Sequence, residues 1–311
     1  MADCLILSAA ARRLATEIEA GAPERLSLTV CDSVEAALER YSGETMLFGE
    51  PDLAAAVIDR LPDIEWVQST WAGIAPMLKV QRRDFVLTGV KGVFGPQMAE
   101  YVLGYLLAYE LKIIERRESQ QQKIWNPSRS GMLAGKRMLL LGTGSIGSHI
   151  GGAAAALGVH VVGVNRSGAC PAGFQRIVSV RQMPAELEQA DYVVSTLPQT
   201  SLSDNLLDDA ALKKMPTHGV LVNVGRSNVL DTTALVAALR SDRLAGAVLD
   251  VFDQEPLPAD SDLWTVPGLT ITAHVSAISH PVLVVPLFLK NLTRYRAGEA
   301  LSYQVDFDNG Y

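Results

Sequence analysis

Three glycines in the spacing GxGxxG impose the strongest local constraint on this chain. Gly142, Gly144 and Gly147 follow an apolar run at residues 137–141 and open a stretch with helical spacing at residues 145–157. Glycine is the residue that tolerates positive φ and close backbone approach. The pattern therefore predicts a strand, a tight turn and a helix that packs closely against the strand.

The predicted turn also ends at a helix N-terminus, where the first amides have no intrahelical acceptor and favour an anion. In this context Gly142 permits the turn, Gly144 admits a pyrophosphate, and Gly147 brings the helix close to the strand. The alternative is an ordinary strand–turn–helix whose glycines are only convenient. We expect a bound dinucleotide here, contacted by Gly142, Gly144, Ser145, Ile146 and Gly147.

Short apolar runs alternate with helical spacing twice along the chain, which indicates two α/β domains with parallel sheets. Expected strands of the first series are residues 4–7, 26–30, 45–48, 66–69 and 85–88. Expected strands of the second series are residues 137–141, 160–164, 192–196, 220–224, 247–251 and 270–272. Expected helices include residues 51–61, a long helix from Gly95, residues 145–157, and residues 281–297 with a kink at Pro286.

Composition narrows the class of protein. The 311 residues suit about two domains, and a net charge of −7 without a basic cluster argues against a nucleic-acid partner. The three cysteines form no CxxC pair and the five histidines form no HxH or HExxH pair, so neither a disulfide framework nor a metal is expected. No apolar run is long enough for a membrane span, and no leader pattern is found, so we expect a cytoplasmic protein.

The residues after the second predicted strand of the dinucleotide domain indicate which cofactor binds. A carboxylate there would hold the ribose 2′-hydroxyl of NAD, but the chain has Asn165, Arg166 and Ser167. Arg166 can pair with a 2′-phosphate, and the two neighbours can add hydrogen bonds. We therefore predict NADP(H), with NAD(H) disfavoured; the alternative is that Arg166 is only a solvated loop residue.

Three reactive residues follow three further predicted strands. Arg226, Glu255 and His274 each come soon after such a strand, and strand carboxyl ends line the ligand crevice of an open α/β sheet. A guanidinium can hold the carboxylate and polarise the carbonyl of a 2-keto acid, and a histidine can donate the proton that follows hydride transfer. A carboxylate beside that histidine favours its protonated form. Separately, each residue has a structural reading: a surface arginine, a turn glutamate and a core histidine.

Several segments together resemble the D-isomer-specific 2-hydroxyacid dehydrogenase family, over essentially the whole chain. They are residues 133–136, 142–147, 223–227, 249–257 and 272–276. Upstream, residues 68–74 resemble the family's substrate loop, and residues 98–100 the start of its interdomain helix. The short N-terminal half and the run 165–167 look most similar to the glyoxylate/hydroxypyruvate reductase A branch.

The resemblance implies a Rossmann cofactor domain, residues 98–278, inserted into a flavodoxin-like substrate domain, residues 1–97 and 279–311. It implies a homodimer, catalytic roles for Arg226, Glu255 and His274, and carboxylate binding by the backbone of Ala72 and Gly73. Trp71 is an expected substrate contact, or else a packing residue. Asp250 matches a family acid near the nicotinamide, and Asn223 lies at a strand end near the site, although both can serve structure alone. Further expected cofactor contacts are Leu197, Pro198, Val224 and Gly225.

The chain departs from the family at two loop positions. Ser227 replaces a frequent Gly and Ala273 a frequent Pro, which puts the local loop shape and the substrate fit in doubt. The leading interpretation is NADPH-dependent reduction of glyoxylate or hydroxypyruvate to the 2-hydroxy acid. The alternatives are the same chemistry on a larger aryl or branched 2-keto acid, and a dinucleotide-sensing protein similar to the C-terminal binding protein corepressors.

Overall fold

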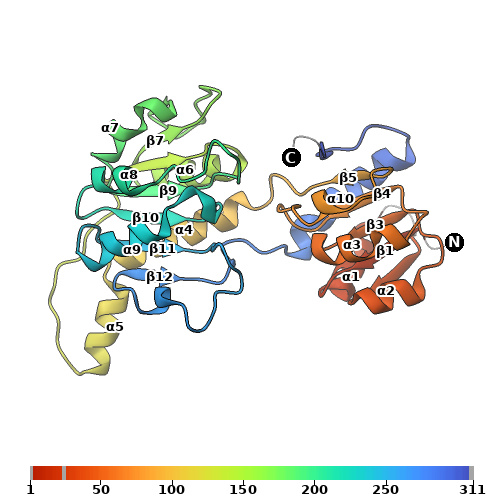
Figure 1. Cartoon of the computed structure of the whole chain (residues 1–311), viewed down its shortest axis with the longest axis horizontal. Helices are drawn as coiled ribbons and strands as arrows, with labels where there is room; N and C mark the ends of the chain where they lie inside the picture. Colours follow the sequence, from red (N-terminus) through yellow and green to blue (C-terminus); the bar gives the residue numbers. More distant parts are fainter. Residues whose placement is uncertain (1–2, 23–25, 308–311) are drawn as a thin grey trace. The chain divides into compact units, whose positions relative to one another are not determined.

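A computed structural model describes residues 3–22 and 26–307 and divides them into two compact units (Figure 1). Unit 1 holds the residues up to Val93 together with those from Ser279 onward, and unit 2 is Phe94–Ile278. The sequence predicts spans of 1–97 with 279–311 and of 98–278. The predicted boundary at which the chain passes from the first domain into the second thus lies four residues later than in the structure. The reason is that helix α4, Gly95–Glu110, packs over its whole length in unit 2. Residues 1–2, 23–25 and 308–311 of the predicted spans lie outside the described residues.

Unit 1 is a parallel sheet of five described strands in the order β2-β1-β3-β4-β5. The strands are β1 Cys4–Leu7, β2 Leu28–Cys31, β3 Met46–Gly49, β4 Trp66–Ser69 and β5 Val86–Thr88. Its helices are α1 Ala11–Gly21, α2 Val34–Arg40, α3 Pro51–Val57 and α10 Pro281–Arg296. This is the flavodoxin-like strand order, as expected. The predicted helix 51–61 is shorter as α3, because its last turn tightens to a 3₁₀ helix at Ile58–Arg60.

Helix α10 belongs to unit 1 because its apolar face completes the core there. Phe288 is fully buried and stacks on Phe48 and Trp66, with ring centroids 4.6 and 5.3 Å apart. A buried amide pair adds a polar link, since Asn291 Nδ2 donates to Gln68 Oε1 at 3.1 Å. Pro286 lies inside α10 without ending it.

Unit 2 is a parallel sheet with the described strands in the order β12-β11-β10-β9-β6-β7-β8. The strands are β6 Arg137–Leu141, β7 His160–Val164, β8 Arg176–Val178, β9 Tyr192–Ser195, β10 Val220–Asn223, β11 Gly246–Leu249 and β12 Leu269–Ile271. This order matches the doubly wound dinucleotide-binding fold. Successive strands are added on one side of β6 as far as β8, and from β9 onward they are added on its other side. The predicted fold class, two doubly wound parallel-sheet domains, is confirmed.

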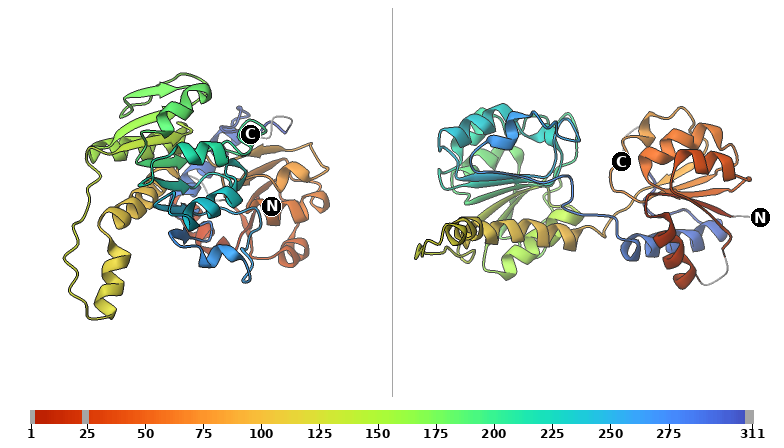
Figure 2. Two further views of the ribbon diagram at one scale, coloured as in Figure 1. Left: turned by 60° about the vertical axis from the view of Figure 1, so that its left-hand side comes forward. Right: turned by 90° about the horizontal axis from the view of Figure 1, so that it is seen from below.

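Helices cover both faces of the unit 2 sheet (Figure 2). These helices are α4, α6 Ser145–Ala156, α7 Met183–Leu187, α8 Asp209–Lys214 and α9 Thr232–Arg240, whereas α5 Ile113–Gln121 projects away from the sheet. The long helix predicted from Gly95 is interrupted, because Lys112 takes a left-handed conformation with φ +52° and separates α4 from α5. Within the described ranges, no helix has both the length and the apolar character needed to cross a bilayer.

Candidate active site

The glycine turn between β6 and α6 has the close approach that its sequence predicts. Gly142 has φ +92°, and a Cβ on Gly147 would lie 2.0 Å from the Gly142 carbonyl oxygen. A Cβ on Gly144 would meet no atom within 4 Å, so the space beside the turn is open. The first turn of α6 carries no acidic side chain and no side-chain cap. Its amides and this open approach fit a dinucleotide pyrophosphate.

The loop after β7 is tied by Asn165. The Asn165 side-chain amide donates to the Ala169 carbonyl at 2.8 Å and to Thr143 Oγ1 at 2.5 Å, and its Oδ1 accepts from the Gly168 amide at 2.8 Å. Asn165 thus holds the loop against the glycine turn, a task that its spacing did not predict. Arg166 and Ser167 are exposed, and among the described side chains none pairs with Arg166. The guanidinium is therefore available to an anion.

The loops after β9 and β10 pack on each other next to the glycine turn. A Cβ on Gly225 would lie 2.6 Å from the Leu197 carbonyl oxygen, so only glycine fits there. Leu197 is half-buried, Pro198 is exposed, and Val224 is buried. Contacts of these four residues with a cofactor stay a prediction, but all four follow the carboxyl ends of β9, which pairs with β6, and of β10, which pairs with β9.

Glu255 and His274 are brought together from the loops that follow β11 and β12. His274 Nδ1 lies 2.8 Å from Glu255 Oε2, while Glu255 Oε1 accepts from the Phe252 amide at 2.9 Å. The second bond fixes the carboxylate, so the imidazole is oriented by a group that is itself held. Within the part of the chain that the structure describes, no protein group bonds the other ring nitrogen, Nε2.

Arg226 lies close enough to Glu255 for their charges to interact. Burial lowers the pKa of the Arg226 guanidinium, and the Glu255 carboxylate opposes that shift. The guanidinium gives one hydrogen bond, from Nη1 to the Gly225 carbonyl at 2.7 Å. Its other donors remain available for a carboxylate or carbonyl. Of the three residues singled out from sequence, Glu255 and His274 are thus in contact, and Arg226 interacts with the same carboxylate through its charge.

Two buried polar residues, Asn223 and Asp250, hold the loops around them. Asn223 donates to the Arg226 carbonyl at 3.0 Å and accepts from the Gly225 amide at 3.1 Å. Asp250 is fully buried, and its carboxylate accepts bonds from the loop that carries His274. The resemblance suggested Asp250 as a cofactor contact, which stays a prediction. The observed bonds are with protein.

The predicted substrate loop lies in unit 1, after β4. Ser69 fixes the turn, because its Oγ accepts from the Trp71 amide at 3.0 Å and donates to the Trp71 carbonyl at 2.8 Å. Trp71 is 38% exposed. In the described chain, the amides of Ala72 and Gly73 have no acceptor, so they are available to bind an anion.

Tyr101 and Thr272 were missed by the sequence reading. The Tyr101 hydroxyl, on α4, lies 2.6 Å from Thr272 Oγ1, which in turn donates to Asp250 Oδ1 at 2.5 Å. Burial raises the pKa of Tyr101, which keeps its hydroxyl protonated. Spacing carries no signal for this contact, because α4 and β12 are far apart in sequence. No three acidic, cysteine or histidine side chains of the described chain are grouped to hold a metal.

Comparison with known proteins identifies the family. Residues 103–276, more than half of the chain, match the model of the D-isomer specific 2-hydroxyacid dehydrogenase, NAD binding domain. The chain belongs to the D-isomer specific 2-hydroxyacid dehydrogenase family, and it is therefore an oxidoreductase that uses a nicotinamide dinucleotide.

Individual relatives match between 70% and 99% of this chain. A family protein from Aeromonas salmonicida subsp. salmonicida A449 is 38% identical, with a TM-score of 0.95 over 99% of this chain and 100% of that one. An NADPH-dependent glyoxylate/hydroxypyruvate reductase from Sinorhizobium meliloti, solved with NADP and sulfate, is 25% identical, with a TM-score of 0.84 over 99% and 100%. Glyoxylate/hydroxypyruvate reductase A of Salmonella newport is 28% identical over 70% of each chain.

The glycine turn generates a direct test. Gly147→Ala should weaken dinucleotide binding by about tenfold or more, because its Cβ would force α6 away from the Gly142 carbonyl and misplace the phosphate-binding amides. Gly152→Ala on the same helix is the matched control, since its Cβ would meet only one atom, at 4.0 Å. Isothermal titration of both variants with NADPH measures the difference, and equal affinities would contradict this role of Gly147.

Proposed function

We propose that this protein reduces a small 2-keto acid, glyoxylate or hydroxypyruvate, to the 2-hydroxy acid with NADPH. The observation that carries the proposal is the 2.8 Å contact between His274 and Glu255, at the strand edge from which the loop of Arg226 also leaves. The names of the relatives from Sinorhizobium meliloti and Salmonella newport support the choice of substrate.

The trio of Arg226, Glu255 and His274 divides the work of this reaction, with one task for each residue. The reduced nicotinamide, when bound, supplies a hydride to the carbonyl carbon. Arg226 binds the substrate carboxylate and polarises the carbonyl with donors that the protein does not use. His274 gives the proton at Nε2 to the carbonyl oxygen, which becomes the hydroxyl. Glu255 accepts a hydrogen bond from Nδ1 and so fixes the orientation of the ring, with Nε2 left for the substrate.

The first test measures NADPH oxidation with glyoxylate, hydroxypyruvate, pyruvate and phenylpyruvate. His274→Ala should lower kcat by about 100- to 10,000-fold, because the proton donor is lost, while NADPH affinity survives. Arg226→Ala should raise KM and lower kcat together, since it removes carboxylate binding and carbonyl polarisation. Preference for phenylpyruvate would favour the larger-substrate alternative. Tight NADPH binding without turnover of any keto acid would contradict the enzyme assignment of these residues.

We propose NADPH rather than NADH because Arg166 is an exposed, unpaired cation on the loop after β7. Arg166→Ala should raise KM for NADPH by about tenfold or more, the cost of one charge-assisted hydrogen bond, and leave KM for NADH unchanged. Arg240→Ala, which removes another exposed arginine of unit 2 on α9, is the control. An unchanged ratio of the two KM values in Arg166→Ala would show that another group selects the cofactor.

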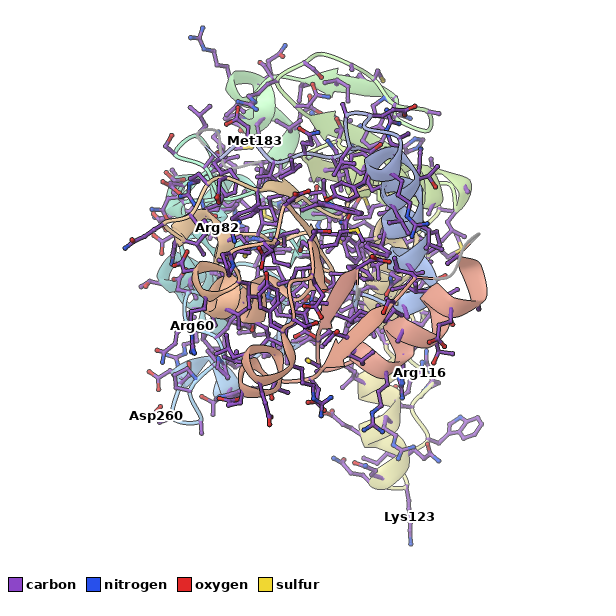
Figure 3. The ribbon with its side chains drawn as sticks, turned by 90° about the vertical axis from the view of Figure 1, so that its right-hand side faces the viewer. Arg60, Arg82, Arg116, Lys123, Met183 and Asp260 are labelled. Carbon is purple, nitrogen blue, oxygen red and sulfur yellow. The ribbon has the colours of Figure 1, made fainter. Side chains whose placement is uncertain are left out.

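We also propose that the protein is a homodimer, joined through an arm formed by residues 113–130. Helix α5 extends away from the rest of unit 2, with Lys123 at its far end (Figures 1 and 3). Arg116 closes the arm on itself through bonds to the carbonyls of Leu111 at 2.9 Å and Ser128 at 2.8 Å. The arm is therefore a preformed element.

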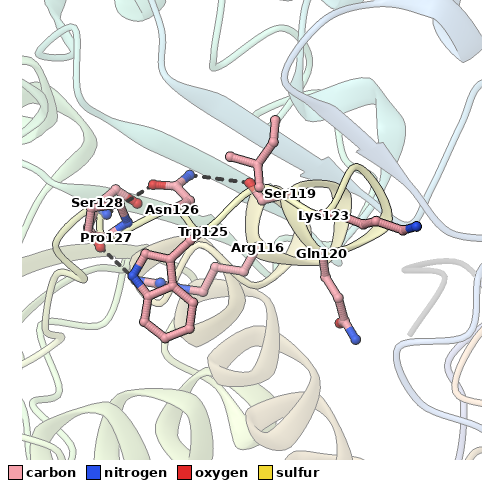
Figure 4. A pocket seen from close by; sticks show the side chains of 9 residues that line it. Arg116, Ser119, Gln120, Lys123, Trp125, Asn126, Pro127 and Ser128 are labelled. Atoms are coloured by element: carbon pink, nitrogen blue, oxygen red, sulfur yellow. Dashed lines mark hydrogen bonds between the residues drawn. The ribbon is translucent and has the colours of Figure 1, made fainter.

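The arm exposes apolar side chains that nothing within the described chain covers. Trp125 is 93% exposed and borders a hollow of about 630 Å³ between α5 and the returning segment (Figure 4). Ile113, Ile114 and Ile124 are each more than half exposed. Residues 113–130 hold four basic and two acidic side chains, whereas the whole chain carries −7, so charge favours a second copy as the occupant. Apolar patches of this kind mark interaction sites.

Analytical ultracentrifugation tests the arm. The wild type should sediment at twice the chain mass, and Trp125→Asp combined with Ile124→Asp should weaken dimerisation by about 100-fold or more, since charges would enter an apolar contact. Leu202→Asp changes another exposed apolar residue, 68% exposed and outside the arm, and should leave the mass unchanged. A monomeric wild type, or a dimer that tolerates both arm substitutions, would contradict the proposal.

The cellular location is likewise a proposal. The cysteines Cys4, Cys31 and Cys170 are all free. Free thiols without a disulfide framework fit a reducing compartment, which supports the expected cytoplasmic location.

A further inference from the structure

Asp250 is a buried carboxylate without a basic partner. It follows β11, is fully inaccessible to solvent, and forms no ion pair with any described residue. Burying a carboxylate costs free energy unless hydrogen-bond donors replace the lost water. The groups that donate hydrogen bonds to Asp250 therefore indicate which part of the protein its carboxylate stabilises.

All of these donors belong to the loop that follows β12. Asp250 Oδ1 accepts from Thr272 Oγ1 at 2.5 Å and from the Val275 amide at 2.8 Å. Its Oδ2 accepts from the Ser276 amide at 2.9 Å, and its main-chain carbonyl accepts from the His274 amide at 2.9 Å. The amides of residues 274–276 thus all bond to one residue: two of them to its carboxylate and one to its main-chain carbonyl. The Thr272 hydroxyl and two amides replace the water that the buried carboxylate has lost.

His274 needs this support because its backbone is in an unfavourable conformation. Its φ is +54°, in the left-handed region that side chains with a Cβ seldom occupy. A residue stays in that region only when the surrounding structure determines its conformation. The Thr272 amide continues the sheet by bonding to the Leu249 carbonyl at 3.0 Å, and from His274 to Ser276 the amides bond to Asp250 instead.

We propose that Asp250 is a positioning residue that holds the loop 272–276 so that His274 meets Glu255. This proposal deepens the proposed function and rests on it for the role of His274. Asp250 affects the reaction through the position of His274, because its carboxylate bonds the loop amides. The neighbouring strand shows the same arrangement, because buried Asn223 clamps the turn that carries Arg226.

The first experiment is a double-mutant cycle with Asp250→Asn and His274→Ala. Asparagine keeps the size of the side chain, but its amide group cannot accept from both Val275 and Ser276. Asp250→Asn alone should lower kcat by about 100-fold, the scale of a reactive group displaced by an ångström, with NADPH affinity unchanged. Added to His274→Ala, it should cost no more than about twofold, because the group that it positions is already gone.

Asp231→Asn is the matched control for this cycle. Asp231 caps α9 in the same unit by accepting from the Ala234 amide, and asparagine caps a helix as well as aspartate does. It should leave kcat unchanged. A further loss of about 100-fold on adding Asp250→Asn to His274→Ala would overturn the proposal, because Asp250 would then act on the cofactor or on the fold directly.

A second measurement does not depend on activity. Hydrogen exchange of the Ser276 or Val275 amide should be at least about tenfold faster in Asp250→Asn than in the wild type, because asparagine replaces one of the two acceptor oxygens with an amide group. The His274 amide is an internal reference, because its acceptor is the main-chain carbonyl, which the substitution keeps. Unchanged exchange would overturn the proposal, whatever happens to kcat. If the wild type reduces no keto acid, the proposed function fails while this measurement still decides whether Asp250 holds the loop.

Thr272→Val gives an independent variant if Asp250→Asn does not fold. It removes one bond to the carboxylate and keeps both amide bonds and the side-chain volume. We expect a kcat loss of about tenfold, again absent in the His274→Ala background. The same loss in both backgrounds would overturn the proposal.

Discussion

Parallel pairing of β10, β11 and β12 in one register is the constraint on which the site depends. Asn223 lies opposite Leu249, and Leu249 lies opposite Ile271, so the three strands end level with one another. The loops that leave them start from a single edge of the sheet. A slip of one residue would turn every side chain to the other face, and the apolar cores on both faces oppose it. Core packing therefore sets the positions from which the reactive loops begin.

The trio combines different degrees of contact with water. The Arg226 side chain is half-buried, whereas the His274 and Glu255 side chains are 49% and 36% exposed. Burial reduces the competition of water for the guanidinium, which suits a group that binds an anion. Exposure suits the role that we propose for His274, because a proton donor has to be reprotonated from solvent. The same edge of the sheet thus provides both surroundings.

The sequence predicted the parts of the structure that short-range patterns govern. The strands at residues 4–7, 66–69, 137–141 and 160–164 were located to the residue, because apolar runs and glycines mark them. The short strand β8, Arg176–Val178, and the left-handed Lys112 between α4 and α5 carry no such signal. Lys112 adopts a conformation that glycine favours, and only tertiary packing determines it.

Among the candidate site residues, too, some were predicted from the sequence, whereas the contacts of others were not. Arg226, Glu255 and His274 were found because each reactive side chain follows a strand, and strand ends converge in a parallel sheet. Asn165 and Asp250 were assigned to a ligand, and the structure shows that both also bond nearby loops, through main-chain groups and one hydroxyl each. Their residue types suit either use. Only the positions of the partner amides, up to 26 residues away for Asp250, distinguish the two.

The tether made by Asn165 has a consequence for how this protein can change. The Asn165 side chain fixes the main chain of the loop through hydrogen bonds. The side chain of residue 166 takes no part in these bonds and lies outside the two apolar cores of unit 2. Charge at position 166 is thus free to vary at little cost to folding. If Arg166 selects NADPH as proposed, cofactor preference and thermodynamic stability are separable properties of this domain.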